Sequence, residues 1–586
     1  MICLFYSIIA PKTKKNSSHC CNFQKNPIFA FAKAGCASTK EYRMVSSSIG
    51  NINKRKYPVG IQSFESIRTG GYVYVDKTPL LYKMITEGKP YFLSRPRRFG
   101  KSLMVDTLAC IFEGRRELFE AFTTEDGTEQ PQLFIATTNW KWEKHPVLRF
   151  DFSAGDLESI EQLDALIDYM LGEYEKKYGI TPARTDANIR FINLIREAER
   201  QTGQKVVVLV DEYDNMMLHS LGDAEKQKIV RQRFQNLFGP LESEDVHLQF
   251  VFITGISKFS QMGVFSKLNQ LVNISMVPVF DTVCGISEEE LVTTLRADIE
   301  MLGQKKGLTF EEMFAVLKEN YDGYHFSEAM TDMYNPFSLI KAFSFEKVDD
   351  YWFSSGTPGA LIDMLVQMPP IDLIDIDGKE CQSSDFDLSF DSYSSPLPIL
   401  YQSGYLTIKQ YDAELESYTL GFPNLEVRKG FADCLYQYVE HGRAQVDMNK
   451  SSLFLAYKRF RRDGELAEFI EAIKTFFSGI PYHIEKGNGN EHYYHALLYT
   501  LLMSFGADLR CEDASAKGRS DITLLMPKGI YILELKYDRP VQDALDQIDR
   551  NGYADKYCLD GRPITKVGIV FSEKERNISE WEAVGV

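Results

Sequence analysis

The chain has 586 residues, of which 44% are hydrophobic and 25% are charged, a balance typical of a globular protein with several domains. Its 82 acidic residues outnumber the 66 basic residues and give a net charge of −16, which restricts any nucleic-acid contact to a local basic patch. No stretch approaches the ~18 consecutive apolar residues of a transmembrane helix, so we expect no membrane partner.

Four of the ten cysteines lie in the first 36 residues, and the others are scattered singly without a C-x-x-C pair. This usage argues against a zinc site or a disulfide framework and favours a reducing, cytoplasmic location. Residues 1–43 differ from the rest and are predicted to be a non-native or disordered extension. A poor signal peptide, a lipoprotein cleavage site near Cys36, and upstream sequence before a true start at Met44 are the three interpretations, and we favour the last.

Residues 91–102, YFLSRPRRFGKS, have the pattern of a phosphate-binding loop. Three apolar residues predict a short buried strand, and Gly100, Lys101 and Ser102 begin an apolar helix. In such a loop, backbone N–H groups and the helix dipole face the phosphates of a nucleoside triphosphate. Lys101 would reach the β- and γ-phosphate oxygens, and Ser102 would ligate Mg²⁺. This stretch alone leaves nucleotide binding and an ordinary basic loop equally open.

One position departs from the usual pattern G-x-x-x-x-G-K-[ST]. The chain has Arg95 where that pattern has its first glycine, followed by Pro96, Arg97 and Arg98. We therefore expect a loop shape that accepts a side chain at this position, and we include Arg98 among the predicted nucleotide contacts.

Strands and helices then alternate, as in a parallel α/β sheet. A second apolar strand is predicted at 147–153, helices at 157–178 and 186–201, and a fully apolar strand at 206–210. This last strand ends in an acidic pair: Asp211 would share Mg²⁺ with the loop serine, and Glu212 would orient the attacking water. Two solvated carboxylates at a strand end are the less favoured alternative, because a phosphate-loop candidate precedes them.

A further buried strand is predicted at 248–255. Thr254 would lie at the same sheet edge and sense the γ-phosphate; its alternative is a backbone hydrogen bond at the strand end. Arg231 and Arg233, on the preceding helix, are weighed as arginine fingers acting in trans within a homo-oligomer. A solvated helix face is the favoured interpretation for both.

The remaining chain divides by composition into a helical lid at 281–370, a region at 371–450 and a last domain at 451–586. Residues 366–394 are rich in Asp, Ser and Pro and predict an acidic linker. The order helix, strand, turn, strand and helix that follows is winged-helix-like, although its acidic hairpin favours packing over DNA binding.

Two apolar strands near the C-terminus carry a second set of charged residues. Asp521 begins GRSDITLLM, and YILELKY contains Glu534 and Lys536 two residues apart, so that both point to one face. Charged residues inside a buried strand indicate a site. Asp521 and Glu534 would bind a divalent cation together with the Leu535 carbonyl, and Lys536 would position a water for attack on a phosphodiester.

Other elements add to this set. Glu491, on the preceding helix, would supply another carboxylate, and Gln547, on the following helix, would assist. Basic residues that would neutralise phosphates are Lys486, Lys517, Arg519, Lys528 and Arg539. The alternative is an edge strand with a salt pair between residues i and i+2.

Several motifs together resemble the bacterial AAA-ATPase-like proteins, which are commonly fused to a C-terminal PD-(D/E)xK nuclease-superfamily domain. They are DKT (76–78), SRPRRFGKSL (94–103), VVLVDEYD (207–214), FITGISKFS (252–260), YDGYHF (321–326), YNPFS (334–338) and LYQSGYLTI (400–408). The resemblance covers roughly 55–575. It implies that Arg95 belongs to that family's own form of the phosphate loop.

The resemblance implies an α/β protein with an AAA-like P-loop NTPase domain at 55–280 containing a parallel sheet, a helical and winged-helix-like middle region, and a C-terminal PD-(D/E)xK α/β domain. The predicted nucleotide contacts are Arg98, Gly100, Lys101, Ser102, Asp211 and Thr254. The predicted metal ligands are Ser102, Asp211, Glu491, Asp521 and Glu534. The predicted catalytic residues are Glu212, Asp521, Glu534, Lys536 and Gln547.

The sequence thus predicts an ATP-binding protein whose ATPase activity is coupled to a metal-dependent nuclease. The expected ligands are ATP, Mg²⁺ with Mn²⁺ as an option at the nuclease site, and nucleic acid, with DNA favoured over RNA. A nucleotide-switched binding protein with a non-cleaving nuclease fold is the alternative, and a scaffold with an inactive ATPase is a third.

Overall fold

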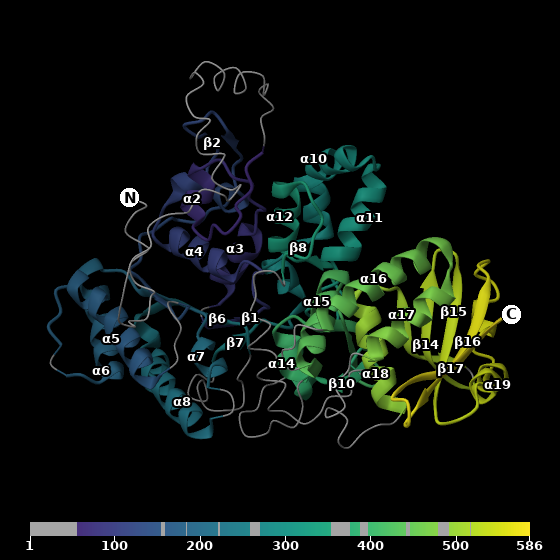
Figure 1. Ribbon diagram of the computed structural model, residues 1–586. Helices are drawn as coiled ribbons and strands as arrows, with labels where there is room; N and C mark the ends of the chain where they lie inside the picture. Colours follow the sequence, from purple (N-terminus) through teal and green to yellow (C-terminus); the bar gives the residue numbers. More distant parts are fainter. Residues whose placement is uncertain are drawn as a thin grey trace, which may run out of the picture. The chain divides into compact units, whose positions relative to one another are not determined.

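Figure 1 shows the computed structural model of the protein, which divides into the units Met1–Arg55 and Lys56–Val586. The structure describes residues 55–88, 90–153, 159–182, 184–220, 223–257, 270–352, 376–386, 397–440, 446–478, 491–515 and 517–586. The predicted extension 1–43, most of the acidic linker and Lys486 lie outside these residues. None of the described helices has the length and apolarity that crossing a bilayer requires.

A five-stranded parallel sheet forms the centre of the N-terminal domain (Figure 1). In spatial order its strands are β4 (Val147–Asp151), β5 (Val206–Asp211), β6 (Leu248–Gly255), β1 (Pro90–Ser94) and β7 (Val272–Asn273). One strand, β6, therefore separates the strand before the phosphate loop from the strand that ends in the acidic pair. All three end at the same edge of the sheet, as the sequence predicts for parallel strands.

Helices cover both faces of this sheet. They are α2 (Phe64–Thr69), α3 (Thr78–Glu87), α4 (Lys101–Phe112), α5 (Ile160–Lys177), α6 (Ala187–Thr202), α7 (Asn215–Leu218), α8 (Ala224–Phe238) and α9 (Pro240–Ser243). Along β5, Val207 and Leu209 pack in the core that contains α4, whereas Val208 and Val210 pack in the core that contains α5, α6 and α8. The all-apolar strand is explained by this burial on both sides.

The middle region begins with a helical part. It contains β8 (Ile286–Ser287), α10 (Glu288–Lys306), α11 (Phe310–Tyr321), β9 (Met333–Tyr334) and α12 (Pro336–Phe345). Ser287 and Thr309 start α10 and α11 with capping boxes. The N-cap hydroxyl accepts a hydrogen bond from the N3 backbone N–H, and the side chain of the N3 glutamate accepts one from the N-cap backbone N–H. These caps fix where each helix begins.

A three-stranded antiparallel sheet follows, in the order β10-β12-β11. Its elements are β10 (Lys379–Gln382), α14 (Leu397–Gln402), β11 (Thr407–Asp412), β12 (Ser417–Gly421) and α15 (Leu425–Glu440). The order helix, strand, turn, strand and helix expected from the sequence is present, with β10 as an additional strand. The helices α16 (Val446–Asp463) and α17 (Leu466–Ser478) lead to the last domain.

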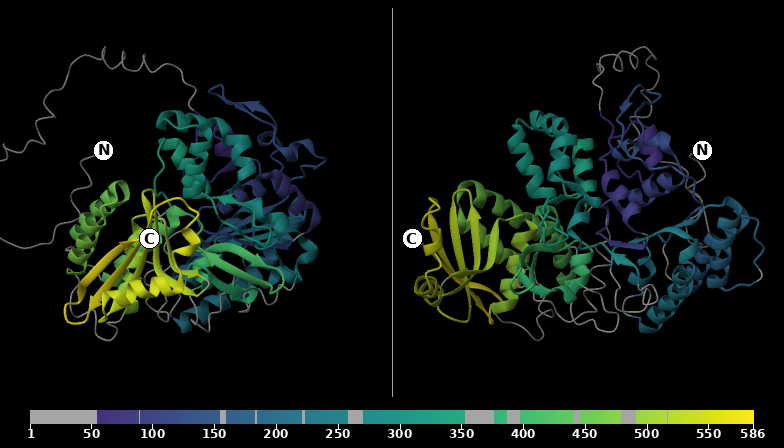
Figure 2. Two further views of the ribbon diagram at one scale, coloured as in Figure 1. Left: turned by 90° about the vertical axis from the view of Figure 1, so that its right-hand side faces the viewer. Right: turned by 180° about the vertical axis from the view of Figure 1, so that it is seen from behind.

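The C-terminal domain is built on a five-stranded mixed sheet, seen from other directions in Figure 2. Its elements are α18 (Glu491–Ser504), β13 (Leu509–Ser515), β14 (Gly518–Met526), β15 (Gly529–Tyr537), α19 (Val541–Asn551), β16 (Ile564–Ser572) and β17 (Asn577–Gly585). Strands β15 and β16 are parallel and are connected through α19, which packs on both. The other neighbours in the order β13-β14-β15-β16-β17 are antiparallel.

Candidate nucleotide and nuclease sites

The phosphate loop joins β1 to α4 through Gly100, whose φ of 91° lies in the left-handed region that glycine adopts without strain. Lys101, the first residue of α4, is buried and turns its ammonium back into the loop. Its Nζ donates to the carbonyls of Arg95 (3.1 Å) and Pro96 (3.2 Å) and lies 3.3 Å from Glu212 Oε1. The lysine thus lies between the loop and the acidic end of β5.

Arg95, the residue that departs from the usual loop pattern, is directed into the protein. Its guanidinium donates to the carbonyls of Ser275 (2.7 Å) and Phe280 (3.2 Å) and stacks 4.0 Å from the ring of Phe326. The backbone N–H of Arg95 donates to Gly255 at the end of β6. The loop accepts an arginine because its side chain binds carbonyls of neighbouring segments.

Asp211 ends β5 next to the start of α4, where its carboxylate accepts a hydrogen bond from the Ser102 side chain. Its Oδ1 is buried and has no hydrogen-bond partner among the described residues. Burial raises the pKa of this carboxyl to about 6, and the neighbouring charge of Glu212 adds to the effect. A buried carboxylate oxygen beside a serine hydroxyl fits the ligand set of a hard divalent cation.

Two other predicted nucleotide contacts point elsewhere in this structure. The buried hydroxyl of Thr254 donates to the carbonyl of Leu93 at 2.8 Å, the arrangement that the sequence offered as its alternative. Arg98 stacks 4.2 Å from the ring of Phe337 and donates to the Trp352 carbonyl at 3.3 Å. Contacts of both residues with a nucleotide stay predictions.

Asp214 is a residue that sequence reasoning did not single out. It is fully buried and accepts hydrogen bonds from the backbone N–H groups of Ile256 and Ser257 and from the Ser257 hydroxyl. A Cβ atom on Gly255 would lie 2.3 Å from its Oδ1, so this approach requires glycine. Asp214 thereby fixes the segment that leaves β6 beside the acidic pair. Its place in the DEYD motif was the available signal.

Arg233, considered above as an arginine finger, forms an ion pair within this chain. Its guanidinium donates to both carboxylate oxygens of Asp164 on α5, at 2.6 and 3.0 Å. This ion pair accords with the favoured interpretation, a helix-face residue.

In the C-terminal domain, Asp521 on β14 and the pair Glu534 and Lys536 on β15 meet at one place. The Asp521 carboxylate accepts the backbone N–H of Leu535 at 2.6 Å. Lys536 Nζ lies 3.0 Å from Glu534 Oε1, 2.8 Å from the Leu535 carbonyl and 3.6 Å from Glu491 Oε1 on α18. Four of the five residues predicted for this site are therefore brought together.

Glu534 is fully buried, and its Oε2 has no hydrogen-bond partner among the described residues. Burial and the adjacent charge of Asp521 raise its pKa to about 8, and burial raises the pKa of Asp521 to about 6. Two crowded, poorly solvated carboxylates are stabilised by a cation between them. The donor set therefore fits a divalent cation, which Asp521 and Glu534 would bind.

Gln547 lies on α19, where its amide is 3.4 Å from the hydroxyl of Tyr553. No hydrogen bond joins it to the carboxylates within the described part of the chain, and its role stays a prediction. The described basic residues of this domain that were predicted to neutralise phosphates are all exposed: Lys517, Arg519, Lys528 and Arg539.

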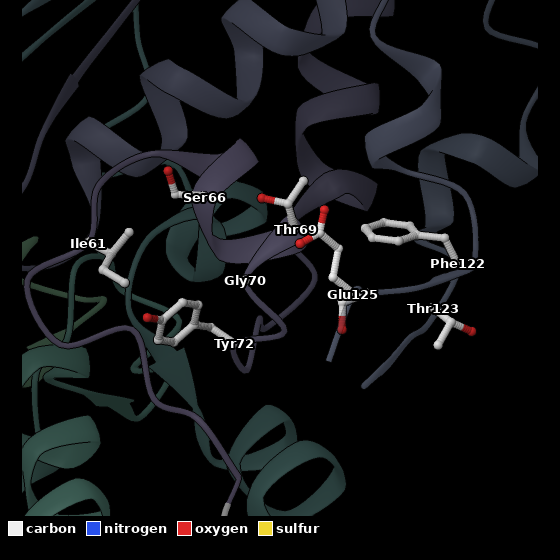
Figure 3. Close-up of a pocket in the computed structure, with 9 residues that line it drawn as sticks. Ile61, Ser66, Thr69, Gly70, Tyr72, Phe122, Thr123 and Glu125 are labelled. Carbon is white, nitrogen blue, oxygen red and sulfur yellow. The ribbon is translucent and has the colours of Figure 1, made fainter. Parts of the chain in front are cut away.

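Two cavities of the N-terminal domain differ in their relation to the phosphate loop. A cavity of about 90 Å³ adjoins the loop at Phe99, Gly100 and Leu103 and is otherwise mainly apolar, with Cys284 and Ile340 in its wall. A more open hollow of about 800 Å³ contains no residue of either site (Figure 3). It is lined by Ile61, Ser66, Thr69, Gly70, Tyr72, Phe122, Thr123, Thr124 and Glu125.

The two sites lie in regions that match known families. Residues 58–265 match the family model described as predicted AAA-ATPase, and residues 489–581 match the model of the PD-(D/E)XK nuclease superfamily. The chain belongs to the AAA-ATPase-like proteins that carry a C-terminal PD-(D/E)XK nuclease-superfamily domain. It is 34% identical over 543 residues to an uncharacterized protein in the vnfD 5' region of Azotobacter chroococcum mcd 1, covering 90% of this chain and 98% of that relative.

Proposed function

We propose that this protein is an ATPase whose nucleotide state controls a metal-dependent nuclease. The observation that carries the proposal is a feature common to both domains. Each contains a buried carboxylate oxygen, on Asp211 and on Glu534, that has no hydrogen-bond partner in the described part of the chain and lies in a cluster with a lysine ammonium. Such clusters are typical of sites where charged substrates and cations bind.

In the N-terminal domain, Lys101 would exchange its contacts with loop carbonyls for the phosphate oxygens of ATP. Ser102 and Asp211 would hold Mg²⁺, which neutralises charge that develops on the phosphates. Glu212 would orient the attacking water.

In the C-terminal domain, Asp521, Glu534 and the Leu535 carbonyl would hold a divalent cation, Mg²⁺ or Mn²⁺, which stabilises the charge of a phosphodiester under attack. Lys536 would position the water. Its ammonium is anchored by Glu534 and by a backbone carbonyl, so it is fixed relative to the carboxylates. Glu491 would complete the cluster. Exposed basic residues nearby would contact nucleic acid, with DNA favoured over RNA.

A chain of contacts supports coupling between the two activities. Arg98 of the phosphate loop donates to the carbonyl of Trp352, whose N–H donates to buried Glu426 at 2.6 Å. Glu426 lies in the first turn of α15, which packs against α18. Arg428 of α15 also donates to the Leu509 carbonyl of β13 at 3.0 Å. A change at the loop would reach the helix that carries Glu491 through these contacts.

The test is cleavage of linear, circular and single-stranded DNA and of RNA by the full chain, with Mg²⁺ or Mn²⁺ and with or without ATP. Asp521→Asn should abolish cleavage and leave ATP hydrolysis intact. Lys101→Ala should abolish hydrolysis and change the dependence of cleavage on ATP. Lys83→Ala, at a lysine on the outer part of α3 that pairs with Glu87, is the matched control.

Binding of nucleic acid without cleavage under all of these conditions would refute the nuclease. It would favour the alternative, a nucleotide-switched binding protein. As part of the proposal we place the protein in the bacterial cytoplasm, because its cysteines are those of a protein from a reducing compartment. Cys110, Cys284, Cys381, Cys511 and Cys558, which the structure describes, form no disulfide bond with one another.

A further inference from the structure

A second group of side chains of the types that ligate metals adjoins the carboxylates of the candidate nuclease site. His495 of α18, Glu512 of β13 and Asp521 of β14 each offer a ligand atom, and these three atoms lie within 4.8 Å of one another. Neither His495 nor Glu512 has a role in the nuclease site described above. The group therefore extends that site to the other side of Asp521, away from Glu534.

The pairing of β13 with β14 places Glu512 beside Asp521. Cys511 pairs with Ile522 and Asp513 pairs with Ser520, which makes Glu512 and Asp521 cross-strand neighbours. Glu512 also has a φ of 48°, the left-handed region, which is strained for a glutamate within a strand.

The helix contributes through its spacing. His495 lies four residues after Glu491 on α18, so both side chains project from one face of the helix. This face is directed at the strands that carry the carboxylates, because Glu491 reaches Lys536 and His495 reaches Asp521.

The histidine is oriented as metal-binding histidines are. Its Nε2 lies 2.9 Å from the backbone carbonyl of Asp521 and 3.3 Å from Cys511 Sγ, and because a carbonyl only accepts, we assign the proton to Nε2. The lone pair is then on Nδ1, which lies 3.7 Å from Glu512 Oε1. A carbonyl that accepts one ring N–H and so directs the other nitrogen toward a ligand site is the usual second shell of a metal-bound histidine.

We propose that His495 Nδ1, Glu512 and Asp521 bind a second divalent transition-metal ion, with Asp521 shared between this ion and the one bound by Glu534. Imidazole nitrogen favours Mn²⁺, Fe²⁺ or Zn²⁺ over Mg²⁺, whereas the all-oxygen set of the first position suits Mg²⁺ or Mn²⁺. The inference rests on the proposed function for its purpose: two ions on either side of one carboxylate would stabilise both the attacking and the leaving oxygen of a phosphodiester.

The test uses Mn²⁺ and the nucleotide-free full chain, with bound ions counted by electron paramagnetic resonance. The wild-type protein should bind two Mn²⁺ ions. The Glu512→Gln variant and the Glu534→Gln variant should each bind one. Loss of a ligand should weaken its ion at least about tenfold, since even a second-shell change has effects of this size. Glu580→Gln, at an exposed residue of β17 in the same sheet, is the control and should bind two.

A spectroscopic signature separates ligation from a structural role. Bound Mn²⁺ should show ¹⁴N coupling from imidazole, which His495→Gln should remove while its amide keeps a donor for the Asp521 carbonyl. Glu534→Gln should retain the coupling. A single ion that Glu534→Gln removes and Glu512→Gln leaves unchanged, or absence of ¹⁴N coupling in wild type, would overturn the inference. Two bound ions without cleavage would refute the nuclease and leave the second metal position standing.

Discussion

At the phosphate loop, Lys101 lies 3.3 Å from Glu212, and in the C-terminal domain Lys536 lies 3.0 Å from Glu534. The surroundings of the two pairs differ. Beside Lys101, the proposed cation ligands are one buried carboxylate and a serine hydroxyl, so most of the coordination would come from phosphates. Beside Lys536, Glu534 and its neighbours supply carboxylates and a backbone carbonyl. The protein alone would provide several cation ligands in the C-terminal domain, but only part of the set at the phosphate loop.

This difference suggests the order in which ligands would bind at each site. If the proposed function holds, a nucleotide would complete the N-terminal site, whereas the C-terminal site would bind a cation before any substrate arrives. The predictions below test this difference, starting with the largest expected effect.

Replacing Lys101 with alanine should lower the turnover of ATP at least about a hundredfold, because a positioned cationic donor to the developing phosphate charge is removed. Steady-state ATP hydrolysis by the purified protein measures this effect, and Lys83→Ala should retain wild-type turnover. ATP hydrolysis at the wild-type rate in Lys101→Ala would refute the proposed role of the phosphate loop.

The contrast in ligands predicts a contrast in Mn²⁺ affinity. Without nucleotide, Asp521→Asn should weaken Mn²⁺ binding by about tenfold or more, and Asp211→Asn should leave it unchanged. With a non-hydrolysable ATP analogue, Asp211→Asn should remove the additional ion that the analogue brings to wild type. Titration calorimetry with and without the analogue measures both effects. A nucleotide-independent effect of Asp211→Asn would contradict the distinction.

The stability of the folded protein should depend on pH through Glu426, which lies in the chain of contacts from the phosphate loop to α15. Burial raises the pKa of this carboxyl to about 7, so the folded protein binds a proton here that the unfolded chain has released above about pH 4.5. Its contribution to stability is present at low pH and is lost as pH rises toward about 7, by at most about 1.4 kcal/mol per pH unit. Glu426→Gln, which cannot titrate, should flatten thermal melting temperatures between pH 5 and 7. An unchanged pH slope would exclude this carboxyl as the source.

The smallest effect is expected at Thr254. Because its hydroxyl bonds the Leu93 carbonyl, Thr254→Val should cost about 1 kcal/mol of stability and alter ATP hydrolysis only a few-fold. Thr254→Ser, which keeps the donor, is the matched control. A loss of hydrolysis comparable with that of Lys101→Ala would assign Thr254 to the γ-phosphate instead.

The sequence predicted the fold well where a pattern has one physical meaning. The apolar run that ends at Asp211 predicted a strand buried on both faces, and Glu534 and Lys536 inside an apolar strand predicted a site in the C-terminal domain. The parallel sheet, the helical middle and the C-terminal sheet domain are confirmed.

Side-chain direction was not predictable in the same way. Nothing in the local sequence tells that the Thr254 hydroxyl turns to a neighbouring strand or that Arg98 stacks on Phe337, because both partners are distant in the chain. His495 and Glu512 were missed for a related reason. The spacing of Glu491 and His495 is visible in the sequence, but the strand register that brings Glu512 opposite Asp521 is not.

Arg95 has a consequence for how ATP would be received. Its guanidinium ties the base of the phosphate loop to residues 275 and 280, so the curvature of the loop is set while the site awaits its ligand. Less conformational entropy is then lost on binding than in a loop that orders around its phosphates. A side chain directed away from the phosphates would in this way raise nucleotide affinity. Replacing Arg95 with the commoner glycine would make the loop more flexible and would increase the entropy lost on binding.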